Sequence, residues 1–205
     1  EITQDLKEKI RKSRREKGRG LLLSFYEFNQ DRRVPRLIRA MKMGLKVALV
    51  SDAGTPCISD PGFKFIKEAQ ESGLVVEPLP GPCAVTTALS ASGFPSDKFS
   101  FGGYLPKSGG EREDSLLEVR KSGKTTCFYE NPSRLVRSLA SIEEVFGPDH
   151  YVYVGLELTK LNEAHYRDRV EKVREHLQAA SESTRLKGEV TLVIAPHTDD
   201  TVDME

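Results

Sequence analysis

Residues 46–62 read KVALVSDAGTPCISDPG. The first five residues are almost all apolar, which is typical of a strand buried on both faces of a parallel sheet. A polar loop over residues 51–60 follows. Asp60 and Pro61 then provide an N-cap and a first-turn proline for a helix that ends at Gly73. This order predicts a βαβ unit with its loop at the carboxyl end of the strand, where open α/β sheets bind ligands.

The same alternation continues on both sides of this stretch. An apolar run at residues 21–26 predicts an earlier strand, and a helix follows with one apolar face made of Val34, Leu37, Ile38 and Met41. A third strand begins at Leu74, and a turn at residues 80–82 leads into a helix of small residues closed by Gly93. These elements predict a mostly parallel sheet. Because three strands make a thin sheet, we expect this lobe to lack its first strand and loop upstream.

The pattern changes after residues 94–97, which we interpret as a link between two lobes. Strands are predicted at 99–105, 125–129, 151–156 and 190–194, with helices over 132–146 and near 170–177. The predicted fold class is therefore α/β with two lobes. An N-terminal lobe spans residues 1–94, a C-terminal lobe with a mixed sheet spans 99–196, and an acidic tail spans 197–205.

Composition excludes several classes of protein. Of the 205 residues, 38% are hydrophobic and 30% are charged, as in ordinary globular proteins. No apolar run is long enough to span a membrane. The three cysteines lie far apart without a C-x-x-C pair, which predicts free thiols in a reducing compartment and no structural zinc. The four histidines show no metal-ligand or triad spacing either, so no metal is expected.

Charge is balanced overall but unevenly distributed. The chain has 31 basic and 31 acidic residues, which is mild evidence against a large phosphate-binding footprint. Residues 7–19, however, hold eight basic and two acidic residues. This run is either a solvated helix face or a phosphate contact, and both interpretations stay open.

Two loops are candidate ligand sites. In the first, the Asp52 carboxylate is suited to accept hydrogen bonds from ligand hydroxyl or amino groups, unless it only stabilises a turn. The second, residues 80–84, exposes backbone N–H groups at the start of a helix. The dinucleotide fingerprint G-x-G-x-x-G and a P-loop lysine are both absent. The residues alone therefore predict an α/β enzyme that binds a small ligand at two loops, without specifying the reaction.

Six motifs in order make the chain recognisable. They are residues 47–62, 78–84, 88–93, 128–135, 157–163 and 187–189. Together they resemble the ribosomal small-subunit RNA methyltransferase I family of the tetrapyrrole methylase superfamily. The resemblance extends from about Ser24 to Pro196. It implies a two-lobe fold with S-adenosylmethionine held in the cleft, no metal, and 2′-O-methylation of a cytidine ribose in small-subunit ribosomal RNA. It also implies a homodimer in the cytoplasm, or in mitochondria if a transit peptide lies upstream.

The resemblance also implies which residues bind the methyl donor. By match to the binding positions of the superfamily, the expected contacts are Val50, Ser51, Asp52, Ile58, Cys83, Ala84, Glu130 and Leu158.

The reaction requires the acceptor oxygen, the methyl group and the sulfur to be in line, and such orientation is worth about 7–11 kcal/mol. Lys160 and Lys187 are candidates for polarising the ribose hydroxyl or contacting phosphate. Glu130, together with Glu157 and Glu189, is a candidate base or orients those lysines. The alternative for all of them is a structural set of ion pairs. Arg134 either contacts RNA phosphate or is a solvated arginine at a helix start.

The chain departs from the family pattern in two respects. The N-terminal strand and glycine-rich loop of the family are absent, and Tyr26 and Phe28 stand where the family tends to have histidines. Two other functions therefore stay open. One is a methyltransferase acting on a tetrapyrrole such as a porphyrin precursor. The other is a non-catalytic relative that binds RNA or a partner.

Overall fold

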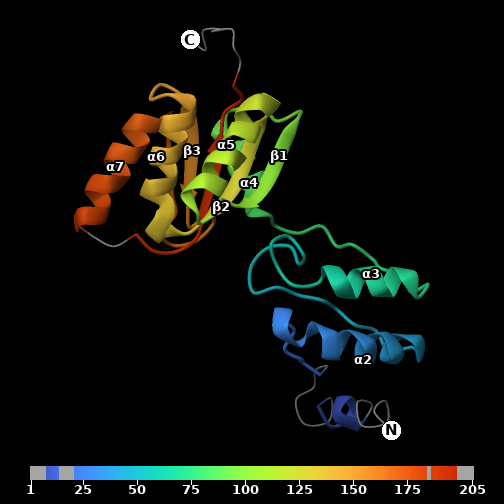
Figure 1. Ribbon diagram of the computed structural model, residues 1–205. Coiled ribbons are helices and arrows are strands. Elements are labelled where there is room, and N and C mark those ends of the chain that lie inside the picture. The colour runs from blue at the N-terminus through green and yellow to red at the C-terminus, as the bar shows by residue number, and fades with distance from the viewer. Residues whose placement is uncertain (1–7, 14–20, 184–185, 198–205) are drawn as a thin grey trace. The chain divides into compact units, whose positions relative to one another are not determined.

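The computed structural model describes residues 8–13, 21–183 and 186–197. The chain divides into two compact units between Pro82 and Cys83 (Figure 1). The sequence suggested a link at residues 94–97 instead. The difference arises because helix α4 (Ala84–Ser92) packs against strands of the second unit. The predicted acidic tail beyond His197, and residues 7 and 14–19 of the basic run, lie outside the described residues.

The first unit is built around two helices. A 3-10 turn, η1 (Glu27–Asn29), leads into α2 (Gln30–Lys42), which packs against α3 (Phe63–Glu71). The predicted apolar face of α2 is confirmed, since Val34, Leu37 and Ile38 are buried and Met41 packs beside them. Phe65 and Ala69 of α3 complete this core.

Three predicted strands of the first unit do not pair with one another among the described residues. Residues 21–26, 46–50 and 74–76 are assigned neither to helix nor to strand. Their side chains nevertheless alternate as in an extended chain, because Leu23, Val47 and Val76 pack on the helical core while the residues beside them face outward. The predicted parallel sheet is therefore wrong for these residues. The expectation that residues 46–50 are buried on both faces is also wrong, because the core built by α2 and α3 covers only one side.

The second unit contains a mixed sheet, as predicted, but the sheet has five strands where the sequence predicted four. In chain order the strands are β1 (Phe99–Tyr104), β2 (Thr125–Glu130), β3 (Tyr151–Leu156), β4 (Ala164–Arg169) and β5 (Val190–Ile194). Their order in the sheet is β1-β2-β5-β3-β4. Strands β1 and β2 are parallel, and the other neighbours are antiparallel.

Helices cover both faces of this sheet (Figure 1). On one face lie α5 (Gly109–Ser122), α6 (Leu135–Phe146) and α7 (Val170–Ser183). The 3-10 turn η2 (Pro132–Arg134) leads directly into α6. Phe128 and Leu192 point into this layer. On the other face lies α4, against Cys127, Tyr153 and Val193. Burial on both faces explains why β2, β3 and β5 are rich in apolar residues.

Gly102 is expected to tolerate no side chain. An added Cβ would overlap the ring of Phe128, which is buried. Gly102→Ala should therefore lower the free energy of unfolding by about 1–3 kcal/mol, as overpacked cores do. Gly109→Ala is the matched control, because a Cβ there meets nothing within 4 Å. Urea unfolding followed by circular dichroism compares the two. Equal midpoints for both variants would contradict the packing described for β1 and β2.

Candidate functional site

Within the first unit, the first candidate loop lies against residues 80–82 of the second one. The Thr55 hydroxyl donates to the carbonyl oxygen of Pro82 at 2.9 Å, which joins the loop after residue 50 to the turn at residues 80–82. Gly54 makes this approach possible, since it has a φ of +74° and a Cβ there would lie 3.6 Å from the same carbonyl. The structure therefore brings together two segments that the sequence singled out separately.

Asp52 is free to bind a ligand. Among the described residues, its carboxylate has no hydrogen-bond or ion-pair partner. The turn is closed instead by Ser51, whose hydroxyl donates to the carbonyl oxygen of Gly54 at 2.7 Å. Val50 is 71% exposed and Ile58 is 40% exposed, so both offer apolar surface. The geometry thus supports a ligand contact by Asp52 over a turn-stabilising role.

Four predicted contacts lie in the second unit, and two of them lie against the same apolar cluster. Cys83 and Leu158 both pack on the cluster between α4 and the sheet. Cys83 is the N-cap residue of α4, and its carbonyl oxygen accepts hydrogen bonds from the hydroxyls of Thr86 and Thr87. Ala84 begins the helix and is half-buried.

Tyr129 lies beside Cys83. Burial and the Cys83 thiol raise the pKa of the Tyr129 hydroxyl to about 12, so this phenol stays protonated. It is therefore a neutral neighbour of the predicted donor contacts.

Glu130 points to the opposite face of the sheet and is fully engaged. Its side chain is 0% exposed. One oxygen accepts from the Asn131 N–H and from Arg134 Nη2, both at 2.5 Å, and the other accepts from the Ser138 hydroxyl at 2.5 Å. A carboxylate with both oxygens committed holds η2 and the start of α6 in place. For Glu130 and Arg134, the geometry favours the structural ion pair over a general base and an RNA contact.

A second carboxylate fixes the turn that follows β3. Glu157 Oε1 accepts from the Glu189 N–H at 2.7 Å and from Lys160 Nζ at 3.1 Å. Lys160 Nζ also lies 3.0 Å from Glu189 Oε2. These contacts hold residues 157–160 against residues 187–189. The ammonium of Lys160 is shared between two carboxylates. Lys187, by contrast, is exposed, and no described residue pairs with its ammonium.

This cluster is complete at neutral pH. The hydrogen bond from Glu189 and then that from Lys160 lower the pKa of Glu157. The hydrogen bonds to Glu189 and Glu157 raise the pKa of Lys160. The contribution of Glu157 is present above its unfolded-state pKa and is lost as pH falls through its lowered folded-state value. The contribution of Lys160 is present below its unfolded-state pKa and is lost as pH rises through its raised folded-state value.

A chain of hydrogen bonds links strands β3 and β4 to the same turn. Tyr153, which is only 2% exposed, has its hydroxyl 2.5 Å from His165 Nδ1, and His165 Nε2 lies 2.5 Å from Glu163 Oε1. The other oxygen of Glu163 accepts from the Thr159 N–H. The pKa of Glu163 is lowered, mainly by the hydrogen bond from the Thr159 N–H and to a lesser extent by His165. The pKa of Tyr153 is raised, mainly by burial and to a lesser extent by the charge of Glu163. Tyr153 and His165 could not be singled out from the sequence, because they meet only when β3 pairs with β4.

The turn needs this support because its backbone is unusual. Glu157 and Thr159 have φ values of 48° and 65°, which non-glycine residues rarely adopt. Leu158 lies between them, and its side chain folds back over Gly155, where a Cβ would lie 2.8 Å from Leu158 Cδ2. The position of Leu158 is therefore set by its contact with Gly155 and by the apolar cluster on which it packs.

Two aromatic residues occupy the positions at which the family tends to have histidines. Phe28 is 97% exposed and Tyr26 is exposed as well. Neither side chain is used by the core of the first unit.

In the part of the chain that the structure describes, no group of three or more His, Cys, Asp or Glu side chains could hold a metal ion. No helix there is long and apolar enough to cross a membrane.

Comparison with known proteins gives consistent results. The profile of the tetrapyrrole (corrin/porphyrin) methylases matches residues 2–174. A protein of Vibrio cholerae named ribosomal RNA small subunit methyltransferase I is 42% identical over 176 residues. The match covers 86% of this chain and 60% of that relative, so the chain spans less than two thirds of the relative's length.

Solved structures show the same fold. The methyltransferase CobJ superposes with a TM-score of 0.63 and 20% identity, covering 96% of this chain and 83% of CobJ. Uroporphyrin-III C-methyltransferase of Thermus thermophilus, complexed with S-adenosyl homocysteine, superposes with a TM-score of 0.52 and 17% identity. That match covers 82% of this chain and 74% of the enzyme.

A substitution at Gly188 tests the contacts that hold residues 157–160 against residues 187–189. Its φ is +93°, and an added Cβ would overlap the Glu157 carboxyl group. Gly188→Ala should therefore cost about 1–2 kcal/mol for the left-handed backbone and about 1–3 kcal/mol more for the overlap. The matched control is Gly103→Ala, which has a φ of +69° and open space around it, and which should show only the backbone cost. Urea unfolding measures both. Equal losses would show that Glu157 does not occupy the space beside Gly188.

Proposed function

The chain belongs to the tetrapyrrole methylase family, and we propose that it transfers a methyl group from S-adenosylmethionine to the 2′-oxygen of a cytidine ribose in small-subunit ribosomal RNA. The observation that carries the donor part of this proposal is the joined pair of loops at residues 51–55 and 80–82, with the unpaired Asp52 carboxylate on the first. The 42% identity to the Vibrio cholerae relative supports the acceptor, since that relative is named for small-subunit ribosomal RNA.

The residues present suit the proposed donor. S-adenosylmethionine carries hydroxyl and amino groups that a carboxylate binds, and we assign that role to Asp52. Val50, Ile58 and Leu158 provide apolar surface, while Ser51, Cys83 and Ala84 contribute the ends of the two turns. The S-adenosyl homocysteine bound by the Thermus thermophilus enzyme of this fold supports the choice of donor. When bound, the donor supplies an activated sulfonium methyl group.

The charged residues divide into two roles. Lys160 shares its ammonium between Glu157 and Glu189, so we assign it to holding the turn that carries Leu158. Lys187 is exposed and unpaired among the described residues, so it is the better candidate for contacting phosphate or polarising the ribose hydroxyl. Glu130 and Arg134 contribute through the segment that they fix, residues 131–138.

The proposal extends to assembly and location. We propose a homodimer, as the family resemblance implies. We also propose a cytoplasmic protein rather than a mitochondrial one, because the relative reported above is bacterial.

A methyl-transfer assay tests the acceptor. The chain is incubated with S-adenosylmethionine carrying a labelled methyl group and either small ribosomal subunits or a porphyrin precursor. The RNA is then digested to nucleosides for mass spectrometry. We expect labelled 2′-O-methylcytidine and no labelled porphyrin. Lys187→Ala should lower kcat/KM for RNA about tenfold or more if the ammonium contacts phosphate or the hydroxyl, whereas the exposed Lys172→Ala should not.

Other outcomes of this assay identify the alternatives. Label on the porphyrin precursor alone would replace the RNA proposal by the tetrapyrrole one. Label in neither acceptor, with S-adenosyl homocysteine still bound, would favour a non-catalytic relative.

A further inference from the structure

The outer side of α2 carries an uncompensated basic stripe. Its core face, with Val34, Leu37 and Ile38, is buried in the first unit. On the opposite side, Arg32, Arg36 and Arg39 follow one another at intervals of four and three residues, and all three are exposed. That spacing aligns side chains along one side of a helix. Lys42 flanks them in the last turn, and we call these four residues the α2 stripe.

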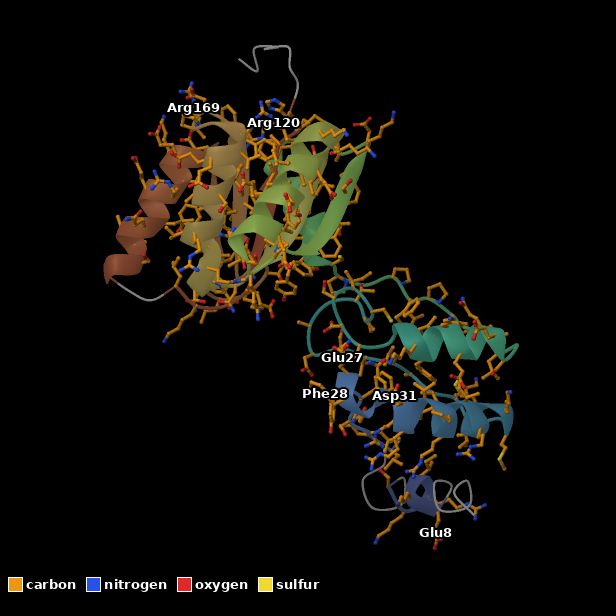
Figure 2. The ribbon with its side chains drawn as sticks, viewed as in Figure 1. Glu8, Glu27, Phe28, Asp31, Arg120 and Arg169 are labelled. Carbon is orange, nitrogen blue, oxygen red and sulfur yellow. The ribbon has the colours of Figure 1, made fainter. Side chains whose placement is uncertain are left out.

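Among the residues that the structure describes, the α2 stripe has no acidic partner. Asp31 is the one acidic residue between Gln30 and Lys46, and Lys64 of α3 pairs with it at 3.1 Å. Asp31 is labelled in Figure 2, which also shows nitrogen-tipped side chains projecting from α2. Arg39 Nε donates to the carbonyl oxygen of Pro35 at 3.2 Å, which leaves its charge uncompensated. No carboxylate among the described residues pairs with any residue of the stripe.

Several arginines of the second unit, by contrast, have carboxylate partners. In the second unit, Arg174 lies 2.5 Å from Glu143 and Arg169 lies 2.7 Å from Asp149. The whole chain has no net charge, so the positive charge of the stripe stands out against a neutral background. A row of unpaired guanidinium groups is suited to a row of phosphates, because phosphates accept their hydrogen bonds and neutralise their charge.

Exposed aromatic residues immediately precede the stripe. Phe28, in the 3-10 turn that leads into α2, is 97% exposed, and Tyr26 is also exposed. Glu27 lies between them, so the first turn is not uniformly basic. Both rings are therefore accessible to a ligand. Flat aromatic side chains beside a basic groove or stripe are the combination that binds single-stranded nucleic acid, since bases stack on the rings.

We propose that the α2 stripe binds the phosphate backbone of single-stranded RNA next to the methylated nucleotide, with Phe28 stacking on one of its bases. This inference rests on the proposed function, because it assigns a surface for the same RNA substrate. From Arg32 to Lys42 the helix rises about 15 Å, which spans several phosphates.

The test measures RNA affinity as a function of salt. The probe is a fluorescein-labelled, single-stranded RNA of about 20 nucleotides, followed by fluorescence anisotropy. In one variant Arg32, Arg36 and Arg39 are all replaced by glutamine, which keeps the helix propensity. We expect a loss of affinity of about tenfold or more at low salt. The slope of log K against log salt concentration should also become shallower by about 2, because each single-strand phosphate contact contributes about 0.7.

Phe28→Ala provides a second and different signature. Loss of stacking should weaken RNA binding about 5- to 150-fold, which corresponds to about 1–3 kcal/mol per stacked base. The salt slope should stay unchanged, because phenylalanine carries no charge. A merely solvated helix face would show neither effect.

A matched control removes the same charge elsewhere. Lys121, Lys124 and Lys172 are exposed basic residues of the second unit, and no described carboxylate pairs with their ammonium groups. Their replacement by glutamine should change RNA affinity less than about threefold. Circular dichroism and S-adenosyl homocysteine binding should match the wild type in every variant, which separates a lost RNA contact from a lost fold.

Two results would overturn the inference. One is equal loss of affinity in the stripe variant and the control, which would indicate general charge attraction only. The other is an affinity of the stripe variant for the RNA probe equal to that of the wild type. If that variant bound the probe normally but failed to bind assembled small subunits, the stripe would contact a protein partner. Failure of the proposed function itself is distinguishable, because the wild-type chain would then not methylate small-subunit RNA, whatever the affinity of the stripe variant for the RNA probe.

Discussion

The Glu157 carboxylate fixes the edge of the second unit at which β3 ends and β5 begins. It accepts a backbone N–H from Glu189 and an ammonium hydrogen from Lys160, and Gly188 leaves the space that it occupies. The left-handed backbone of residues 157 and 159 is costly by itself and persists because its surroundings over-determine it. The order of the sheet makes this arrangement possible, because β5 lies between β2 and β3 and pairs antiparallel with both.

The sequence predicts most of the second unit and less of the first. Strands β2, β3 and β5 are rich in apolar residues because helices cover both of their faces. Strand β4 was missed because this edge strand reads AHYRDR and alternates between half-buried and exposed residues. In the first unit the alternation of residues 21–26, 46–50 and 74–76 is real, but apolar character cannot specify a pairing partner. Val50 and Ala48 are apolar and yet exposed, which the sequence alone does not reveal.

The candidate site shows the same division. A loop at a predicted strand end was enough to single out Asp52, and the structure leaves that carboxylate unpaired among the described residues. The charged residues were harder to interpret, because a glutamate at a strand end is equally suited to catalysis and to an ion pair. Only the contacts in the structure distinguish the two roles. Both carboxylate oxygens of Glu130 accept hydrogen bonds, whereas Lys187 is exposed. The support that Tyr153 and His165 give to the turn depends on strand pairing, and spacing along the chain carries no trace of it.

We expect the joined loops of the first unit to present Asp52 to the methyl donor. Calorimetric titration of S-adenosyl homocysteine into the wild-type chain, Asp52→Ala and the exposed control Asp97→Ala measures this contact. Binding should be saturable near one site per chain, weakened about tenfold or more by Asp52→Ala and unchanged by Asp97→Ala, because a hydrogen bond to a charged group is lost only in the first variant. Equal binding by the wild type and Asp52→Ala, or no binding by the wild type, would contradict this expectation.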